Sequence, residues 1–143
     1  MDHAERELIN PPNLIAPRGF THGILVTGGK LLFLAGQDAS DAEGRIVAPG
    51  DLVAQFEEAL RHLVAVVEAA GGNATDIVDL TIFVKSRDEY VARLKALGEV
   101  YRRFFGGYYP AMALFEVGGF FQPDALVEIK GIAVLQEERS LAT

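Results

Sequence analysis

The stretch Ala125–Leu135, ALVEIKGIAVL, decides the fold because its residues alternate between two faces of a predicted β-strand. One parity is apolar and suits a face that helices cover: Val127, Ile129 and Ala133. The other parity mixes apolar with charged side chains: Leu126, Glu128, Lys130, Ile132 and Val134. The strand therefore has one apolar face that suits the core and a second face that carries both apolar and charged side chains.

The preceding predicted strand, residues 111–117, alternates in the same way. We assign Met112, Leu114 and Glu116 to the face that carries Glu128, with Ala111, Ala113, Phe115 and Val117 on the other. That mixed face is too apolar for water, yet it holds charges. A symmetric oligomer that buries the face and leaves polar clefts between subunits accounts for both properties.

Upstream, two short β runs, residues 24–27 and 31–35, are joined by Gly28-Gly29 and predict a β-hairpin. A loop with several turn-forming residues follows. Apolar residues at helical spacing from Leu52 to Ala70 then predict an amphipathic helix, which Asp51 caps and Gly71-Gly72 ends.

Residues 77–85 alternate as a strand, and Ser86-Arg87-Asp88-Glu89 has the form of a capping box. We expect one helix from there to Phe104, ending at Gly106-Gly107. Right-handed crossovers return both helices to the same face of one mixed sheet. The predicted class is α+β.

Length and composition predict one domain over residues 1–143, because a chain of 143 residues that is 50% hydrophobic can bury a core. The excess of 20 acidic over 13 basic residues gives a net charge of -7, which disfavours a nucleic-acid partner. The sequence has no Cys, which excludes thiol nucleophiles and disulfides. A charged N-terminus and the lack of a long apolar run predict a cytoplasmic protein without a membrane partner.

Several segments together resemble the Rid family of reactive intermediate deaminases, also called YjgF-like or endoribonuclease L-PSP-like, from about Asn10 to Leu135. They are Ile9-Asn10-Pro11-Pro12, Ala35-Gly36-Gln37, Val100-Tyr101 with Phe104-Phe105, Tyr109-Pro110-Ala111 and residues 126–133 (LVEIKGIA). The resemblance implies a chorismate-mutase-like mixed sheet with two helices on one face. It also implies a homotrimer with a central β-barrel and small-ligand clefts between subunits.

The resemblance further implies a catalytic site. In deaminating members an Arg directly after Pro-Ala grips the substrate carboxylate, and a Glu on the last strand positions the water that attacks an imine. Glu128 matches this Glu, whereas Met112 stands in place of the Arg. Phe20, Ala35, Gly98 and Leu114 replace a Tyr, a Ser, an Asn and a Cys of the family pattern. The cleft is therefore expected to prefer a ligand that is neutral or is anchored differently.

Glu128 is the predicted catalytic residue, and the predicted substrate-binding residues are Phe20, Ala35, Gly36, Met112, Ala113 and Leu114. The structural alternative for Glu128 is an ion pair with Lys130, which would lower its pKa. Met112 and Leu114 have an alternative role as interface core. Glu116 either forms an acid/base couple with Glu128 or is structural.

His22 is either a proton shuttle or a solvated loop residue. His3, His22 and His62 lack metal-ligand spacing, so we predict no metal and no cofactor. Arg102 and Arg103 suit the end of a helix, and either is also a candidate replacement contact for an anion.

These features favour hydrolytic deamination, or a related hydrolysis, of a small reactive enamine or imine. The alternative is a non-catalytic module that binds a small apolar or aromatic metabolite in the same cleft. Ribonuclease activity, which an older family name suggests, ranks last because the chain is acidic and has no basic stripe.

Overall fold

The computed structural model describes residues 4–137, which build an α+β fold around one mixed sheet. Four strands lie in the order β3 (Lys30–Gln37), β6 (Val127–Leu135), β4 (Ile77–Val84) and β5 (Ala111–Glu116). β6 runs antiparallel to both of its neighbours, and β4 runs parallel to β5. The strand with the two-faced pattern is thus an inner strand, and its register depends on a partner on each side.

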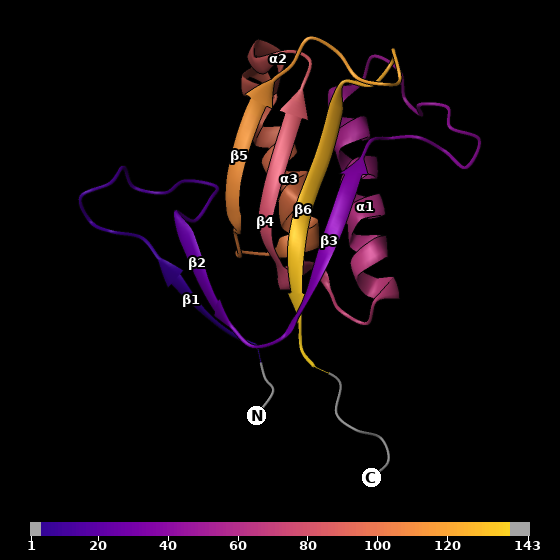
Figure 1. The fold of residues 1–143 in the computed structure, drawn as a ribbon. Coiled ribbons are helices and arrows are strands. Elements are labelled where there is room, and N and C mark those ends of the chain that lie inside the picture. The colour runs from indigo at the N-terminus through magenta and orange to yellow at the C-terminus, as the bar shows by residue number, and fades with distance from the viewer. Residues whose placement is uncertain (1–3, 138–143) are drawn as a thin grey trace.

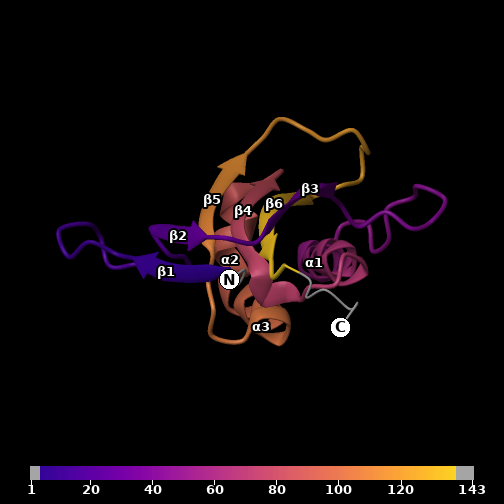
Figure 2. The ribbon, with the colours of Figure 1, turned by 60° about the horizontal axis from the view of Figure 1, so that its bottom comes forward.

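Both long helices lie on one face of this sheet, as the sequence predicts (Figures 1 and 2). α1 (Leu52–Ala69) begins where the Asp51 carboxylate accepts a hydrogen bond from the Ala54 amide, and α3 (Leu94–Phe105) ends at Gly106. The largest fully buried side chains come from α1, α3 and the strand faces beneath them, among them Phe56, Leu60, Leu97, Ile82 and Ile129. The core therefore lies between the helices and the sheet.

The predicted hairpin is wrong in its pairing. β2 (Gly23–Thr27) pairs with β1 (Glu5–Ile9) in a separate two-stranded sheet, whereas β3 pairs with β6. Gly28 and Gly29 do adopt positive φ, at 80° and 84°, but they lead the chain from one sheet to the other. A Cβ at Gly29 would lie 2.7 Å from the Leu135 carbonyl oxygen, so the backbone passes close to the end of β6. The glycine pair permits a sharp turn without determining which strands pair across it.

The single helix expected after Ser86 is divided at Arg93 into α2 (Arg87–Ala92) and α3. The Ser86 hydroxyl accepts a hydrogen bond from the Glu89 amide, which confirms the predicted start. No side chain of α2 is fully buried, although Tyr90 packs against the core, whereas α3 buries Leu97, Val100, Tyr101 and Phe105. The break leaves α3 packed on the core while α2 remains at the surface.

The face assigned to β5 is also wrong. In the parallel register with β4, Met112 lies beside Leu80 and Leu114 beside Ile82, which are core residues on the helix side. Phe115 instead lies beside Phe83 on the opposite side, where the two rings stack. Both parities of this six-residue strand are apolar, so the strand alone does not indicate which one faces the helices.

The sheet face away from the helices, here called the bare face, is strongly apolar. By the strand registers its apolar members include Leu31, Phe33, Phe83, Phe115 and Ile132, and Glu128, Lys130 and Thr81 lie among them. Leu31, Phe33 and Phe115 are exposed by 66%, 71% and 52%. This agrees with the prediction of a face that is too apolar for water.

One buried polar residue on α1 provides a test of this architecture. Gln55 is fully buried, its amide nitrogen donates to the Ala48 and Asp124 carbonyls, and its amide oxygen accepts from the Leu126 amide at 2.8 Å. Gln55→Leu leaves these backbone groups without a partner and is expected to lower the free energy of unfolding by about 3 kcal/mol. Urea denaturation measures the change.

Gln122→Leu is the matched control, because the Gln122 side chain makes no hydrogen bond within residues 4–137. An equal loss in both variants would contradict a specific role for Gln55.

Candidate functional site

Glu128 lies on the bare face beside a bulge in β3. The register between β3 and β6 shifts between Leu34 and Gln37, so Ala35 and Gly36 occupy the irregular segment. A Cβ built on Gly36 would overlap the Oε2 atom of Glu128, so the missing side chain makes room for the carboxylate. The structure thus brings together three of the predicted site residues, Ala35, Gly36 and Glu128.

The Glu128 carboxylate has an unusual electrostatic setting. Partial burial raises its pKa above the ordinary value, and the negative charge of Asp38 raises it further. Aromatic residues of the β5–β6 connection, Phe120 and Phe121, line a shallow pocket of about 290 Å³ with Glu128, and Phe121 is 94% exposed. The carboxylate therefore borders on an apolar surface instead of a cation.

The alternative ion pair with Lys130 does not form. Both residues are described, no salt bridge joins them, and the pKa of Glu128 is raised instead of lowered. Lys130 lies opposite Thr81, and its charge opposes the rise that burial causes in the pKa of Asp79. The two charged residues of β6 thus have separate neighbours.

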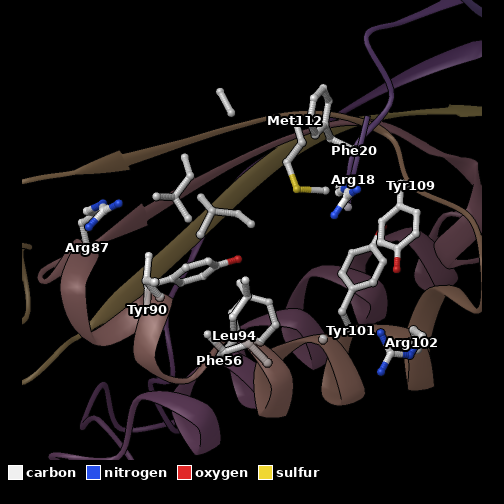
Figure 3. Close-up of a pocket in the computed structure, with 17 residues that line it drawn as sticks. Arg18, Phe20, Phe56, Arg87, Tyr90, Leu94, Tyr101, Arg102, Tyr109 and Met112 are labelled. Carbon is white, nitrogen blue, oxygen red and sulfur yellow. The ribbon is translucent and has the colours of Figure 1, made fainter. Parts of the chain in front are cut away.

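Phe20, Met112, Ala113 and Leu114 lie elsewhere, around a cavity of about 550 Å³. Figure 3 shows this cavity, which the first loop (residues 10–22), β5 and the α2–α3 segment enclose. Thr21 attaches the loop to the strand, because its amide donates to the Pro110 carbonyl at 3.1 Å and its hydroxyl to the Tyr109 carbonyl at 2.6 Å. Met112 and Leu114 thus face the helices, away from Glu128, whereas Ala113 borders the cavity although it shares the parity of Phe115 on the opposite side of the sheet.

The cavity contains residues that the sequence reasoning missed: Arg18, Tyr90, Tyr101 and Tyr109. Tyr101 stacks on Tyr109 with ring centroids 5.0 Å apart, and its hydroxyl donates to the Tyr108 carbonyl. Burial raises the pKa of Tyr101, which keeps the phenol neutral. Helical periodicity marks Tyr101 only as a core residue, and Arg18 lies in a loop where no pattern indicates it.

Within one chain, Glu116 and Glu128 do not form the acid/base couple that was one of the two alternatives for Glu116. Glu116 shares the parity of Met112 and Leu114, and its Oε2 accepts a hydrogen bond from the Arg87 amide at 2.9 Å, at the start of α2. The hydrogen bond that Glu116 accepts is a structural contact, which agrees with the alternative prediction of a structural role.

The two described histidines make structural contacts. His22 Nε2 lies 2.7 Å from the Ile15 carbonyl oxygen, and its ring meets that of Phe20 edge-on. His62 Nδ1 lies 2.9 Å from the Asp38 carbonyl oxygen and therefore links α1 to the end of β3. His3 lies outside the described residues. Within residues 4–137 there is no group of three or more His, Asp or Glu side chains that could hold a metal ion.

The two arginines at the end of α3 differ in their surroundings. Arg103 lies 3.3 Å from the Glu57 carboxylate, whereas Arg102 lines the cavity. Among the residues that the structure describes, no helix is long and apolar enough to cross a membrane.

Known proteins are similar to this chain in sequence and in fold. The profile of the family described as Endoribonuclease L-PSP matches residues 13–135. A RutC family protein of Pyrococcus horikoshii is 31% identical over 124 residues, which cover 87% of this chain and 91% of that protein. The chain belongs to the Rid family.

Two further relatives also match over most of the length of both chains. The protein DfrA of Myxococcus xanthus is 34% identical over 123 residues, covering 86% of this chain and 88% of its own. The crystal structure of a Rid protein of unknown function from Yersinia pestis superimposes with a TM-score of 0.81 at 32% identity, covering 91% of this chain and 98% of that one. The mixed sheet with helices on one face is thus the Rid fold, and the family resemblance predicted from the sequence is confirmed.

The charge of Asp38 provides a test of the Glu128 environment in this Rid protein. Asp38→Asn removes the repulsion and is expected to lower the pKa of Glu128 toward 4.5, its ordinary value. Titration of the 13C-labelled Glu128 carboxyl group by NMR measures the shift. The pKa of Glu128 is higher in the folded protein than in the unfolded chain, so the free energy of unfolding falls as the pH rises from 4.5 to the folded-state pKa. Asp38→Asn should make this fall smaller.

Lys130→Met is the control, since Lys130 acts on Asp79 and not on Glu128. It should leave the pKa of Glu128 in place and raise that of Asp79. A Glu128 pKa that rises in Lys130→Met would contradict this description.

Proposed function

We propose that this Rid family protein hydrolyses a small reactive imine or enamine, with Glu128 as the residue that positions and deprotonates water. The observation that supports this most directly is the carboxylate beside Gly36, partly buried and with a raised pKa. A raised pKa brings a carboxylate closer to the pH at which it works as a base.

The proposed reaction requires no cofactor. An enamine first tautomerises to an imine, because its carbon takes up a proton from water and its nitrogen releases one to water. The water oxygen then attacks the imine carbon while its proton passes to Glu128. Glu128 returns this proton to nitrogen, which gives a carbinolamine. Glu128 then takes the hydroxyl proton and passes it to the same nitrogen, so that the carbon–nitrogen bond breaks and a carbonyl compound and ammonia leave. Each proton that Glu128 accepts is returned within the cycle.

We further propose that the working cleft forms between copies of the chain in a homotrimer whose sheets line a central β-barrel. Within one chain Glu128 is on the bare face, and Phe20 and Met112 are at the cavity on the other side. The exposure of Leu31, Phe33 and Phe115 supports burial of the bare face against another copy. A neighbouring copy would then contribute Phe20, Met112, Ala113 and Leu114 to the Ala35, Gly36 and Glu128 of the first.

Met112 limits the substrates of this cleft. Its side chain has no charge and no hydrogen-bond donor. It therefore cannot form the two hydrogen bonds that an Arg at this position would donate to the carboxylate of a 2-imino acid. Such a contact would contribute on the order of 2 to 5 kcal/mol to binding. We therefore propose that the usual 2-imino acids are poor substrates and that the ligand is held through other contacts.

A non-catalytic role in binding a small metabolite is the second candidate. The observation that favours it is the lining of the cavity, which is mostly aromatic and aliphatic. Ribonuclease activity has less support, because a net charge of -7 opposes the approach of a phosphate backbone.

Glu128→Gln separates catalysis from binding. The variant keeps the size of the side chain but cannot accept a proton, so turnover of imines generated in situ should fall by about 100-fold or more. Coupled ammonia detection measures the rate, with imines from bulky neutral amino acids and from amines without a carboxylate. Unchanged turnover in Glu128→Gln would contradict the hydrolase proposal, and retained ligand binding without turnover in the wild type would favour the second candidate.

The bare face provides a test of the trimer. Phe33→Glu places a charge on the face that the trimer buries and should yield monomers, since an unpaired buried charge costs several kcal/mol. Light scattering coupled to gel filtration measures the mass. Val66→Glu is the control, because Val66 is an exposed apolar residue of α1 on the helix side. A wild-type monomer would contradict the proposed cleft.

A further inference from the structure

The cavity differs in charge from the rest of the chain. Its lining includes three arginines, Arg18, Arg87 and Arg102, and no Asp or Glu, although the whole chain carries 20 acidic and 13 basic residues. All three arginines are exposed, and their guanidinium groups give the edge of the cavity a positive potential. An acidic protein with a positive cavity favours an anionic ligand at that place.

The three arginines are not equally available to a ligand. Arg87 donates to the Asp88 carboxylate at 2.9 Å, which neutralises it. Arg102 folds back over its own helix, where its Nη1 lies 3.2 Å from the position of a Cβ on Gly98. Arg18 forms no ion pair and no side-chain hydrogen bond with any residue between 4 and 137.

Arg18 is also well placed. Its side chain points into the cavity next to Met112 and Phe20, as Figure 3 shows. Thr21, three residues further along, attaches the first loop to Pro110 and Tyr109, which directly precede β5. A guanidinium from the loop therefore lies next to the strand position at which the family's Arg is replaced by Met112.

The remaining wall of the cavity suits a large apolar group. Met112 and Leu114 of β5 and Leu94 and Leu97 of α3 line it, together with the rings of Tyr90, Tyr101 and Tyr109. The Tyr90 hydroxyl points into this space in Figure 3 and has no hydrogen-bond partner within residues 4–137. Burial raises the pKa of Tyr90, so the phenol stays protonated and is available as a donor.

We infer that the cavity binds an amphipathic carboxylate, whose anionic group pairs with the Arg18 guanidinium and whose aromatic or branched aliphatic body packs between Met112 and Leu114 and the tyrosine rings. A volume of about 550 Å³ holds a body of two fused rings. The inference rests on the proposed function only in taking the cavity as the ligand-binding part of the site. It names the contact that replaces the missing Arg and makes Arg18 a specificity-determining residue.

The test compares two probes of the same shape, 2-naphthaleneacetate and 2-naphthaleneacetamide, by isothermal titration calorimetry. The wild type should bind the carboxylate about 10- to 100-fold more tightly than the amide, the range expected for hydrogen bonds to charged groups. Arg18→Gln should remove this preference and leave the affinity for the amide unchanged. Arg18→Lys should restore part of it, since Lys keeps the charge without the two-pronged geometry.

Arg103→Gln is the matched control, because Arg103 pairs with Glu57 and does not line the cavity. It should leave both affinities unchanged. Equal affinity of the wild type for the two probes, or no binding of either, would overturn the inference. So would a preference that survives in Arg18→Gln and disappears in Arg102→Gln, because the anchor would then be Arg102.

The same titrations distinguish this inference from the proposed hydrolase. Neither probe is an imine or an enamine, so the titrations measure binding alone and do not depend on turnover at Glu128. Failure of the hydrolase proposal appears in the ammonia measurements, whereas failure of the Arg18 inference appears in the titrations.

Discussion

Side-chain alternation along β6 is the constraint on which the rest of the structure depends. Val127, Ile129 and Ala133 are fully buried under the helices, so the residues between them must project to the other face of the sheet. A slip of one residue would place Glu128 in the core and remove Ile129 from it, at a cost that the fold cannot sustain. Because β6 is an inner strand, this register also sets the positions of β3 and β4.

Two local contacts hold Glu128 in the position that this register gives it. Gln55 reaches from α1 to the Leu126 amide and the Asp124 carbonyl, which holds the start of β6 only a few residues before Glu128. The bulge at Ala35 and Gly36 then leaves space for the carboxylate, where any larger side chain at Gly36 would displace it. The position of Glu128 is thus supported from the helix layer and from the neighbouring strand, neither of which supplies a cation.

The cavity depends on a different set of contacts. It forms because Thr21 ties the first loop to the segment before β5, next to the α2–α3 segment. Met112 and Leu114 turn toward the helices there and make the wall apolar, while Arg18 brings positive charge from the loop. The loop thus supplies the positive charge, and β5 and the helices supply the apolar wall. Such a cavity suits a ligand that has both a charged group and an apolar body.

The sequence by itself determined the features that depend on neighbouring residues. Helical spacing and the caps at Asp51 and Ser86 located the helix starts, and the parity of β6 separated Val127 and Ile129 from Glu128, because these signals act within a few residues. Only the tertiary structure decided the pairing of β2 with β1, the turn of Met112 toward the helices and the approach of Arg18 to the cavity. Each of these depends on contacts between segments far apart in the chain. Gly28-Gly29 is compatible with more than one strand pairing, and β5 could turn either of its apolar faces to the helices. The long-range contacts determine which arrangement forms.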